Sequence, residues 1–309
     1  SEEDKASYKF QYRKSGTTTW KDVAGEVTVA TNGSSNVAQV ATNLDASTKY
    51  EYRLLQNDTN SEPEEFTTED DIQLPNSGFE DWYTDSDGLP KPAKDASSSF
   101  WDCGNVNYFG KHIMTTQNDE TALGQGSSVK METQETMKII AAGNIFTGTF
   151  ERDGMGGILT LGRNFECRPN KLKGYYKYTS AKVSVSKGHL NEGEDDLCSL
   201  YIALTDEQIT VNTNKGIYFD PNSSAVIAYG SISDEESKGA DSFKEFTVDL
   251  EYKDLKRIPK YIIVVASSSK YGDYMEGGKG STMWLDDLEL VYPKSMEEVP
   301  CIHFLLLKS

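Results

Sequence analysis

The sequence has few basic residues, since 31 Lys and Arg stand against 49 Asp and Glu, and its formal net charge is −18. Nucleic-acid binding depends on clustered Lys and Arg that neutralise phosphates, and the sequence contains no basic stripe. The charge therefore argues against nucleic acid as a partner, and against attraction to an anionic membrane surface. An acidic excess is compatible with calcium or with polar neutral ligands, although it also serves solubility alone.

Histidine and cysteine are scarce as well, with three and four residues. The cysteines are far apart in the sequence and form no Cys-x-x-Cys pair, which argues against a structural zinc site. A bridge from Cys103 to Cys167, or from Cys167 to Cys198, would need an oxidising compartment, and buried free thiols fit the spacing equally well.

Long hydrophobic runs are also missing. The apolar stretch at 302–307 is interrupted by His303, and it is far shorter than the roughly 20 residues that span a bilayer. No signal peptide is recognisable, so an exported form would already have lost its signal.

Catalytic constellations are not evident either. No Gly-x-Ser-x-Gly elbow is present, and the neighbouring acids Asp195-Asp196 and Asp286-Asp287 would face opposite sides of an extended strand. The glycine groups at 154–157 and 277–280 lack the strand-to-helix context of a phosphate loop, and we interpret them as turns without a ligand.

Aromatic and β-branched residues are abundant, with 17 Tyr and 12 Phe, and they recur in short alternating runs between turn residues. This pattern predicts an all-β protein, and a chain of 309 residues usually forms two domains. In the first part we expect strands at 8–13, 26–30, 37–41, 50–55 and 64–68. In the second part we expect them at 128–132, 156–161, 175–179, 199–204, 246–250, 261–266 and 283–292.

A charged connector, Glu69-Asp70-Asp71, precedes a shift in composition toward Trp, Gly and Asn. We therefore place a first domain at 1–71 and a second at 72–293. The tail at 294–309 does not continue the strand pattern.

The first domain carries the pattern of a tyrosine corner, with Leu44 six residues before Tyr50 at the start of a strand. Together with Thr19-Trp20-Lys21 and the final run at 66–68, this pattern resembles strands C to G of a fibronectin type III or immunoglobulin-like module. The resemblance implies a partial β-sandwich that lacks the first strands of the family.

In the last expected strand, Asp286 shares one face with Trp284 and Leu288, so a core on that side would place its carboxylate inward. A buried carboxylate is costly unless it is paired or holds a metal. The pairing of this segment with Asn-x-Gly-Phe-Glu at 76–80 is similar to carbohydrate-binding jelly rolls, which implies a structural calcium ion held by Glu80 and Asp286. Alternatively, the two carboxylates cap strands or bind backbone amides.

Five motifs follow one another in the second domain: LPNSGFEDW from Leu74, FWDCGN from Phe100, AAGNIFTG from Ala141, RPNKLKGYYKY from Arg168 and IALTD from Ile202. They resemble the putative carbohydrate metabolism domain of Bacteroides-type surface lipoproteins. The resemblance implies a larger jelly-roll, galactose-binding-like β-sandwich with a link to carbohydrate. It also implies an exported protein of the cell surface or outer membrane, held by a lipid anchor outside this chain, and it does not imply catalysis.

Sugar binding needs an aromatic ring that stacks on a pyranose and planar polar groups that hold its hydroxyls. We predict this role for Trp101, Asp102, Asn105, Tyr108 and Arg163. The competing interpretation packs Trp101 in the core and uses Asp102 or Asn105 to shape a turn. The predicted function is non-catalytic glycan capture at the cell surface, and the alternatives are a glycoside hydrolase with an unidentified carboxylate pair and an adhesion or assembly subunit.

Overall fold

The computed structural model describes residues 8–25, 27–31, 35–39, 41, 44–57, 59–254 and 257–292. Strands dominate, and the helices of this described part are 3-10 turns of three residues each. These turns are η1 (Ala96–Ser98), η2 (Thr213–Lys215), η3 (Glu236–Lys238) and η4 (Gly272–Tyr274). The predicted all-β class is therefore confirmed, while the tail at 294–309 with Cys301 lies outside the described residues.

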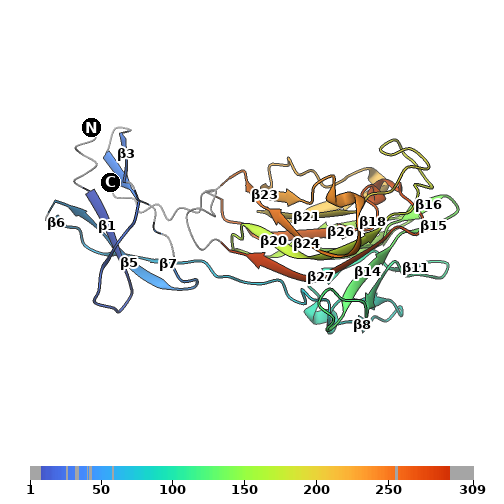
Figure 1. The fold of residues 1–309 in the computed structure, drawn as a ribbon, viewed down its shortest axis with the longest axis horizontal. Coiled ribbons are helices and arrows are strands. Elements are labelled where there is room, and N and C mark those ends of the chain that lie inside the picture. The colour runs from blue at the N-terminus through green and yellow to red at the C-terminus, as the bar shows by residue number, and fades with distance from the viewer. Residues whose placement is uncertain are drawn as a thin grey trace. The chain divides into compact units, whose positions relative to one another are not determined.

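The chain divides into two compact units (Figure 1). Unit 1 takes the described residues up to Ile72 together with Tyr292, and unit 2 takes those of Gln73–Val291. Within the described residues, no helix is long and apolar enough to cross a membrane.

Unit 1 is built around β1 (Tyr8–Lys14) and β5 (Lys49–Gln56), which pair antiparallel. Five further strands complete it: β2 (Lys21–Asp22) on β1, β6 (Thr59–Asn60) and β7 (Glu64–Thr67) on β5, and the hairpin of β3 (Thr28–Thr31) with β4 (Ser35–Ala38). Phe10, Val23 and Ala41 form its small core. The hydroxyl of Tyr50 accepts a hydrogen bond from the amide of Asp45 at 3.0 Å, which is the bond that a tyrosine corner predicts.

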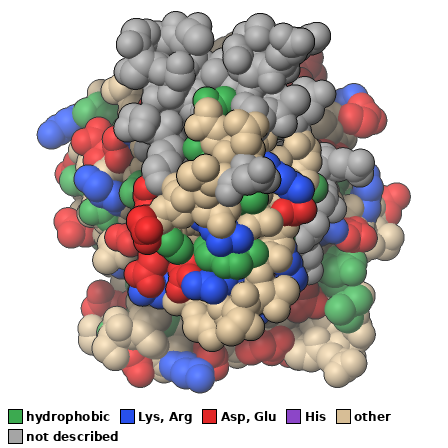
Figure 2. All heavy atoms as spheres, turned by 90° about the vertical axis from the view of Figure 1, so that its left-hand side faces the viewer, with side chains coloured by type: hydrophobic (Ala, Val, Ile, Leu, Met, Phe, Trp, Pro, Cys, Tyr) green, Lys and Arg blue, Asp and Glu red, His purple; other side chains and the backbone are tan. Residues whose placement is uncertain are grey.

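The surface of unit 1 carries charges of both signs. Lys49 pairs with Glu65 at 2.7 Å across neighbouring strands, and the guanidinium groups of Arg13 and Arg53 lie over the ring of Trp20, at 4.4 and 4.3 Å from its centroid. Acidic and basic side chains are interspersed on the face that Figure 2 presents. Because two guanidinium groups already lie over the Trp20 ring, this ring is a poor platform for a sugar.

Unit 2 contains a nine-stranded sheet, which we call the large sheet. Its main path is β22-β18-β17-β26-β21-β23-β25, with β10 on β17 and β19 on β26. The strands are β10 (Trp101–Asp102), β17 (Asn144–Asp153), β18 (Gly156–Leu161), β19 (Arg163–Asn164), β21 (Ser199–Thr205), β22 (Ile209–Asn212), β23 (Val226–Ser231), β25 (Glu251–Tyr252) and β26 (Tyr261–Ser267).

A five-stranded sheet runs in the order β13-β14-β27-β20-β24. Its strands are β13 (Thr115–Asn118), β14 (Ser128–Glu132), β20 (Lys171–Thr179), β24 (Ala240–Asp249) and β27 (Thr282–Val291). In β20 every second residue is buried, including Leu172, Tyr176 and Tyr178, because alternate side chains of a strand point to one face.

Three short hairpins lie outside these sheets. They are formed by β8 (Tyr83–Thr84) with β9 (Pro90–Lys91), β11 (Val106–Asn107) with β12 (Lys111–His112), and β15 (Gln134–Thr136) with β16 (Ile139–Ala141).

The large sheet buries apolar side chains on both faces. Consecutive residues Ile262, Ile263 and Val264 of β26 are all fully buried, which requires cover on each side of the strand. Ile263 belongs to an apolar cluster with Phe146, Leu159, Leu161, Ala203 and Val211, and Phe150 packs against this cluster. We call the side of the sheet that carries this cluster the cluster face. The site described below lies on this face.

The cysteines among the described residues form no disulfide bridge. Cys103 and Cys198 are buried free thiols, so neither of the two bridges considered from the sequence forms. Burial raises the pKa of each thiol to about 12, which makes both unreactive at neutral pH.

Candidate functional site

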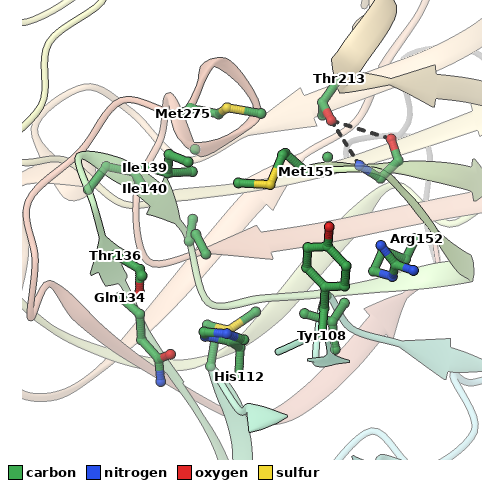
Figure 3. Close-up of a pocket in the computed structure, with 18 of the residues that line it drawn as sticks. Tyr108, His112, Gln134, Thr136, Ile139, Ile140, Arg152, Met155, Thr213 and Met275 are labelled. Carbon is green, nitrogen blue, oxygen red and sulfur yellow. Dashed lines mark hydrogen bonds between the residues drawn. The ribbon is translucent and has the colours of Figure 1, made fainter. Parts of the chain in front are cut away.

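A cavity of about 500 Å³ opens beside the cluster face, where Phe150 and Leu159 belong to its wall. Its volume is within the usual range of small-molecule sites, which runs from about 300 to 1,000 Å³. Three hairpins and one turn surround it (Figure 3). They contribute Tyr108, Phe109 and His112 from β11–β12; Gln134, Thr136, Met137, Ile139, Ile140 and Ala141 from β15–β16; Phe150, Arg152, Met155 and Leu159 from β17–β18; and Asp273 and Met275 at η4.

Polar groups lie among these apolar walls. The guanidinium of Arg152 lies 4.2 Å above the ring of Tyr108, and Thr213 accepts a hydrogen bond from the amide of Gly157 at 3.0 Å (Figure 3). For the side-chain polar atoms of Tyr108, His112 and Thr136, no hydrogen bond is found within the described ranges. These three side chains are therefore available to a ligand.

Asp273 is the one carboxylate among the described residues that line the cavity. Burial raises the pKa of this carboxyl above its ordinary value, and neither an ion pair nor a hydrogen bond to it is found in the described part of the chain. It can accept a hydrogen bond from a hydroxyl or act as a proton donor.

The segment that holds Asp273 is anchored by Glu276, whose side chain is fully buried. Its carboxylate accepts hydrogen bonds from the amides of Lys187 at 2.8 Å and Leu190 at 2.5 Å, and lies 3.0 Å from Nδ1 of His189. The rings of Tyr271 and Tyr274 pack on His189 at 4.4 Å. Although burial raises the pKa of Glu276, these hydrogen bonds outweigh it and lower the pKa below the ordinary value.

The structure places Trp101 in the core rather than at the cavity. Its side chain is 1% exposed, its indole N–H donates to the carbonyl of Pro75 at 2.7 Å, and its ring packs on Phe79 at 5.3 Å. A sugar cannot stack on a ring covered in this way. The prediction of a platform at Trp101 thus finds no support, and the competing interpretation describes its position.

Three other predicted sugar ligands hold the scaffold together. Asp102 pairs with Lys91 at 2.7 Å, and Arg163 donates to the carbonyl of Phe100 at 3.0 Å. Asn105 is 2% exposed and donates to the carbonyl of Thr115 at 2.7 Å. Of the five predicted residues, all of which are described, only Tyr108 lines the cavity.

Glu80 and Asp286 both accept hydrogen bonds from backbone amides. These are the bonds named in the interpretation that competes with a calcium site. Glu80 accepts from the amide of Ser127 at 3.0 Å, and Asp286, 1% exposed, accepts from the amide of Ala122 at 2.8 Å. Burial raises the pKa of Asp286 to about 6, and the negative charges of Asp287 and Glu80 add to this effect. Within the described ranges, no group of three or more His, Cys, Asp or Glu suited to a metal ion is found.

The sequence reasoning missed most of the cavity, because its walls come from hairpin tips. One signal was available: large apolar residues occupy turn positions where Asn or Gly is usual. Met137 begins the two-residue turn between β15 and β16, and Met155 follows Gly154 in the turn between β17 and β18.

Several solved structures are similar to this chain. A putative glycoside hydrolase from Bacteroides thetaiotaomicron VPI-5482 shares 22% identity over 91% of this chain and 95% of its own, with a TM-score of 0.56. Another putative glycoside hydrolase, from Bacteroides vulgatus ATCC 8482, shares 24% identity over 58% of this chain and 77% of its own, with a TM-score of 0.47. TmCBM61 in complex with β-1,4-galactotriose shares 10% identity over 71% of this chain and 97% of its own, with a TM-score of 0.32.

At these identities the likeness concerns the fold alone. Among curated proteins no match to this chain is found. The family described as putative carbohydrate metabolism domain matches residues 34–291, so its match begins in unit 1, upstream of the five motifs. The chain belongs to this carbohydrate-related family.

Proposed function

We propose that this protein binds glycans at the cavity of unit 2 and does not transform them. The observation that carries the proposal is an open cavity of ligand size, with an exposed aromatic ring and unused polar groups at its edge. Phe109 is 93% exposed, which leaves its ring open to the apolar face of a pyranose. His112 and Thr136 offer hydrogen bonds to the sugar hydroxyls.

The number of carboxylates at the cavity favours binding over hydrolysis. Glycoside hydrolysis usually takes two carboxylates, one on each side of the scissile bond. The described lining of the cavity supplies Asp273 alone. Its raised pKa would suit a general acid, which keeps a glycoside hydrolase as the second candidate.

A glycan array with the intact chain and with Phe109→Ala tests the proposal. Specific binding that falls about five- to thirtyfold in Phe109→Ala is expected, because an exposed stacking ring contributes on the order of 1–2 kcal/mol. Ile258→Ala is the matched control, since Ile258 is 61% exposed and does not line the cavity. No binding to any glycan would contradict the proposal and favour an adhesion or assembly role. Sugar release without a stable complex would favour hydrolysis.

The finer architecture and location belong to the same proposal. The tyrosine-corner bond of Tyr50 supports an immunoglobulin- or fibronectin III-like module in unit 1. The two antiparallel sheets of unit 2 support a jelly roll. Family resemblance supports export and a lipid anchor at the cell surface or outer membrane, which fractionation of the native cells and palmitate labelling would test.

A structural calcium ion at Glu80 and Asp286 is a further part of the proposal. Two carboxylates whose negative charges repel each other attract a divalent cation, and burial of Asp286 adds to the need for a counter-charge. Calcium takes about six to eight oxygens, so backbone carbonyls and water would complete the set. A higher unfolding temperature in calcium than in EGTA, absent in Asp286→Asn, would support the ion; equal temperatures would contradict it.

A further inference from the structure

Three hairpin tips at the mouth of the cavity each carry an exposed apolar side chain. Phe109, Met137 and Met155 are 93%, 85% and 56% exposed, and all three belong to the cavity lining. Single exposed apolar residues are common on protein surfaces, but several at one opening form a patch of the kind found at binding sites.

The backbone at two of these tips is unfavourable for the residue that it carries. Phe109 has φ of 52° and Met137 has φ of 50°, in the left-handed region that favours Gly and Asn. Asn or Gly would form these turns with less strain and without exposing a large apolar surface. Bulky residues in strained turns are typical of ligand sites, because folding alone does not require them there.

The interior continues this apolar character. Met114, Met275 and Phe150 contribute to the walls, and Figure 3 shows Met155 pointing into the space toward Ile139 and Ile140. Methionine side chains are flexible and polarisable, so they adapt to apolar groups of different shapes. An unsubstituted sugar would place hydroxyls against these walls and leave them without partners.

We infer that the cavity takes the alkyl, acyl or aryl substituent of a substituted sugar, while the sugar itself lies at the mouth beside Phe109. This inference rests on the proposed glycan binding and names the class of glycan. Within the described residues, the carboxylate of Asp273 has no ion-pair or hydrogen-bond partner. It disfavours the binding of fatty-acid anions and can accept hydrogen bonds from neutral hydroxyl groups.

Titration calorimetry with methyl, butyl, hexyl and octyl β-D-glycosides of glucose, galactose and xylose, below their micelle concentrations, tests the inference. For at least one sugar, each buried methylene is expected to tighten binding by a factor of about four until the cavity is filled. Met155→Ser is expected to reduce the gain from the alkyl chain, measured against the methyl glycoside bound by the same variant, at least about threefold. Ile258→Ser, at an exposed apolar residue outside the cavity, is the matched control.

The remaining outcomes separate a failure of this inference from a failure of the proposed glycan binding. Equal affinity for methyl and octyl glycosides would overturn the inference and leave glycan binding intact. Equal affinity for an octyl glycoside and for sugar-free 1-octanol would overturn glycan binding, because the sugar would then contribute nothing. Binding of none of these compounds, or an alkyl-chain gain that survives in Met155→Ser, would overturn the assignment of the substituent to this cavity.

Discussion

The replacement Asp286→Asn is expected to stabilise the protein at neutral pH in the absence of calcium. Asp286 is 1% exposed and carries a pKa raised from 3.8 to about 6, first because it is buried. An asparagine keeps an oxygen that can accept the hydrogen bond from the amide of Ala122, and it has no charge to bury. The substitution therefore removes a penalty and retains the local contact.

The magnitude follows from the shift in pKa. Each pH unit corresponds to about 1.36 kcal/mol, so ionised Asp286 costs up to about 3 kcal/mol above pH 6. The sign is fixed by proton linkage: the folded state binds this proton more tightly, so the contribution is most favourable below pH 4 and is lost as pH rises to 6. At pH 4 the variant should gain nothing over the original protein.

Urea unfolding at pH 7.5 and at pH 4, in EGTA, measures both free energies of unfolding. Glu289→Gln is the matched control, because Glu289 is an exposed acid on the same strand, β27. The control should change the free energy of unfolding by less than about 1 kcal/mol. A loss of stability in Asp286→Asn at pH 7.5, or an equal gain at both pH values, would refute the reasoning.

Three further predictions concern the core, the anchor of the site and its edge. Trp101→Ala should lower the free energy of unfolding by about 3–5 kcal/mol, measured by urea denaturation, because it empties a buried volume. Glu276→Gln should lower the free energy of unfolding by about 1–3 kcal/mol at pH 7 and speed hydrogen exchange at the amides of Lys187 and Leu190. The difference in stability between the two proteins should shrink as the pH falls through the lowered pKa of Glu276. Unchanged exchange at these amides would contradict the prediction. Phe109→Ala should leave the unfolding temperature within about 2 °C and weaken glycan binding, so a large drop in that temperature would make Phe109 structural instead.

Much of the fold could be predicted from the sequence, because strand signals are local. The expected strands at 128–132 and 156–161 coincide with β14 and β18, since alternation of apolar and polar residues between turns depends on near neighbours. The tyrosine corner at Tyr50 is likewise a short-range pattern with a defined hydrogen bond. The long strand β17 was not among the expected strands, because both of its faces are partly buried and its alternation is weak.

The site depended on tertiary structure. Trp101 and Tyr108 look equally suited to sugar stacking in the sequence, yet one is buried against Phe79 and the other borders the cavity. Which face of a strand is covered is decided by distant segments, so local patterns cannot separate the two. The walls around Met137 and Asp273 come from hairpins and turns far apart along the chain, and only the packed sheets bring them to one opening. The sequence thus determined the β-class and many of its strands, whereas packing between distant segments decided which side chains meet a ligand.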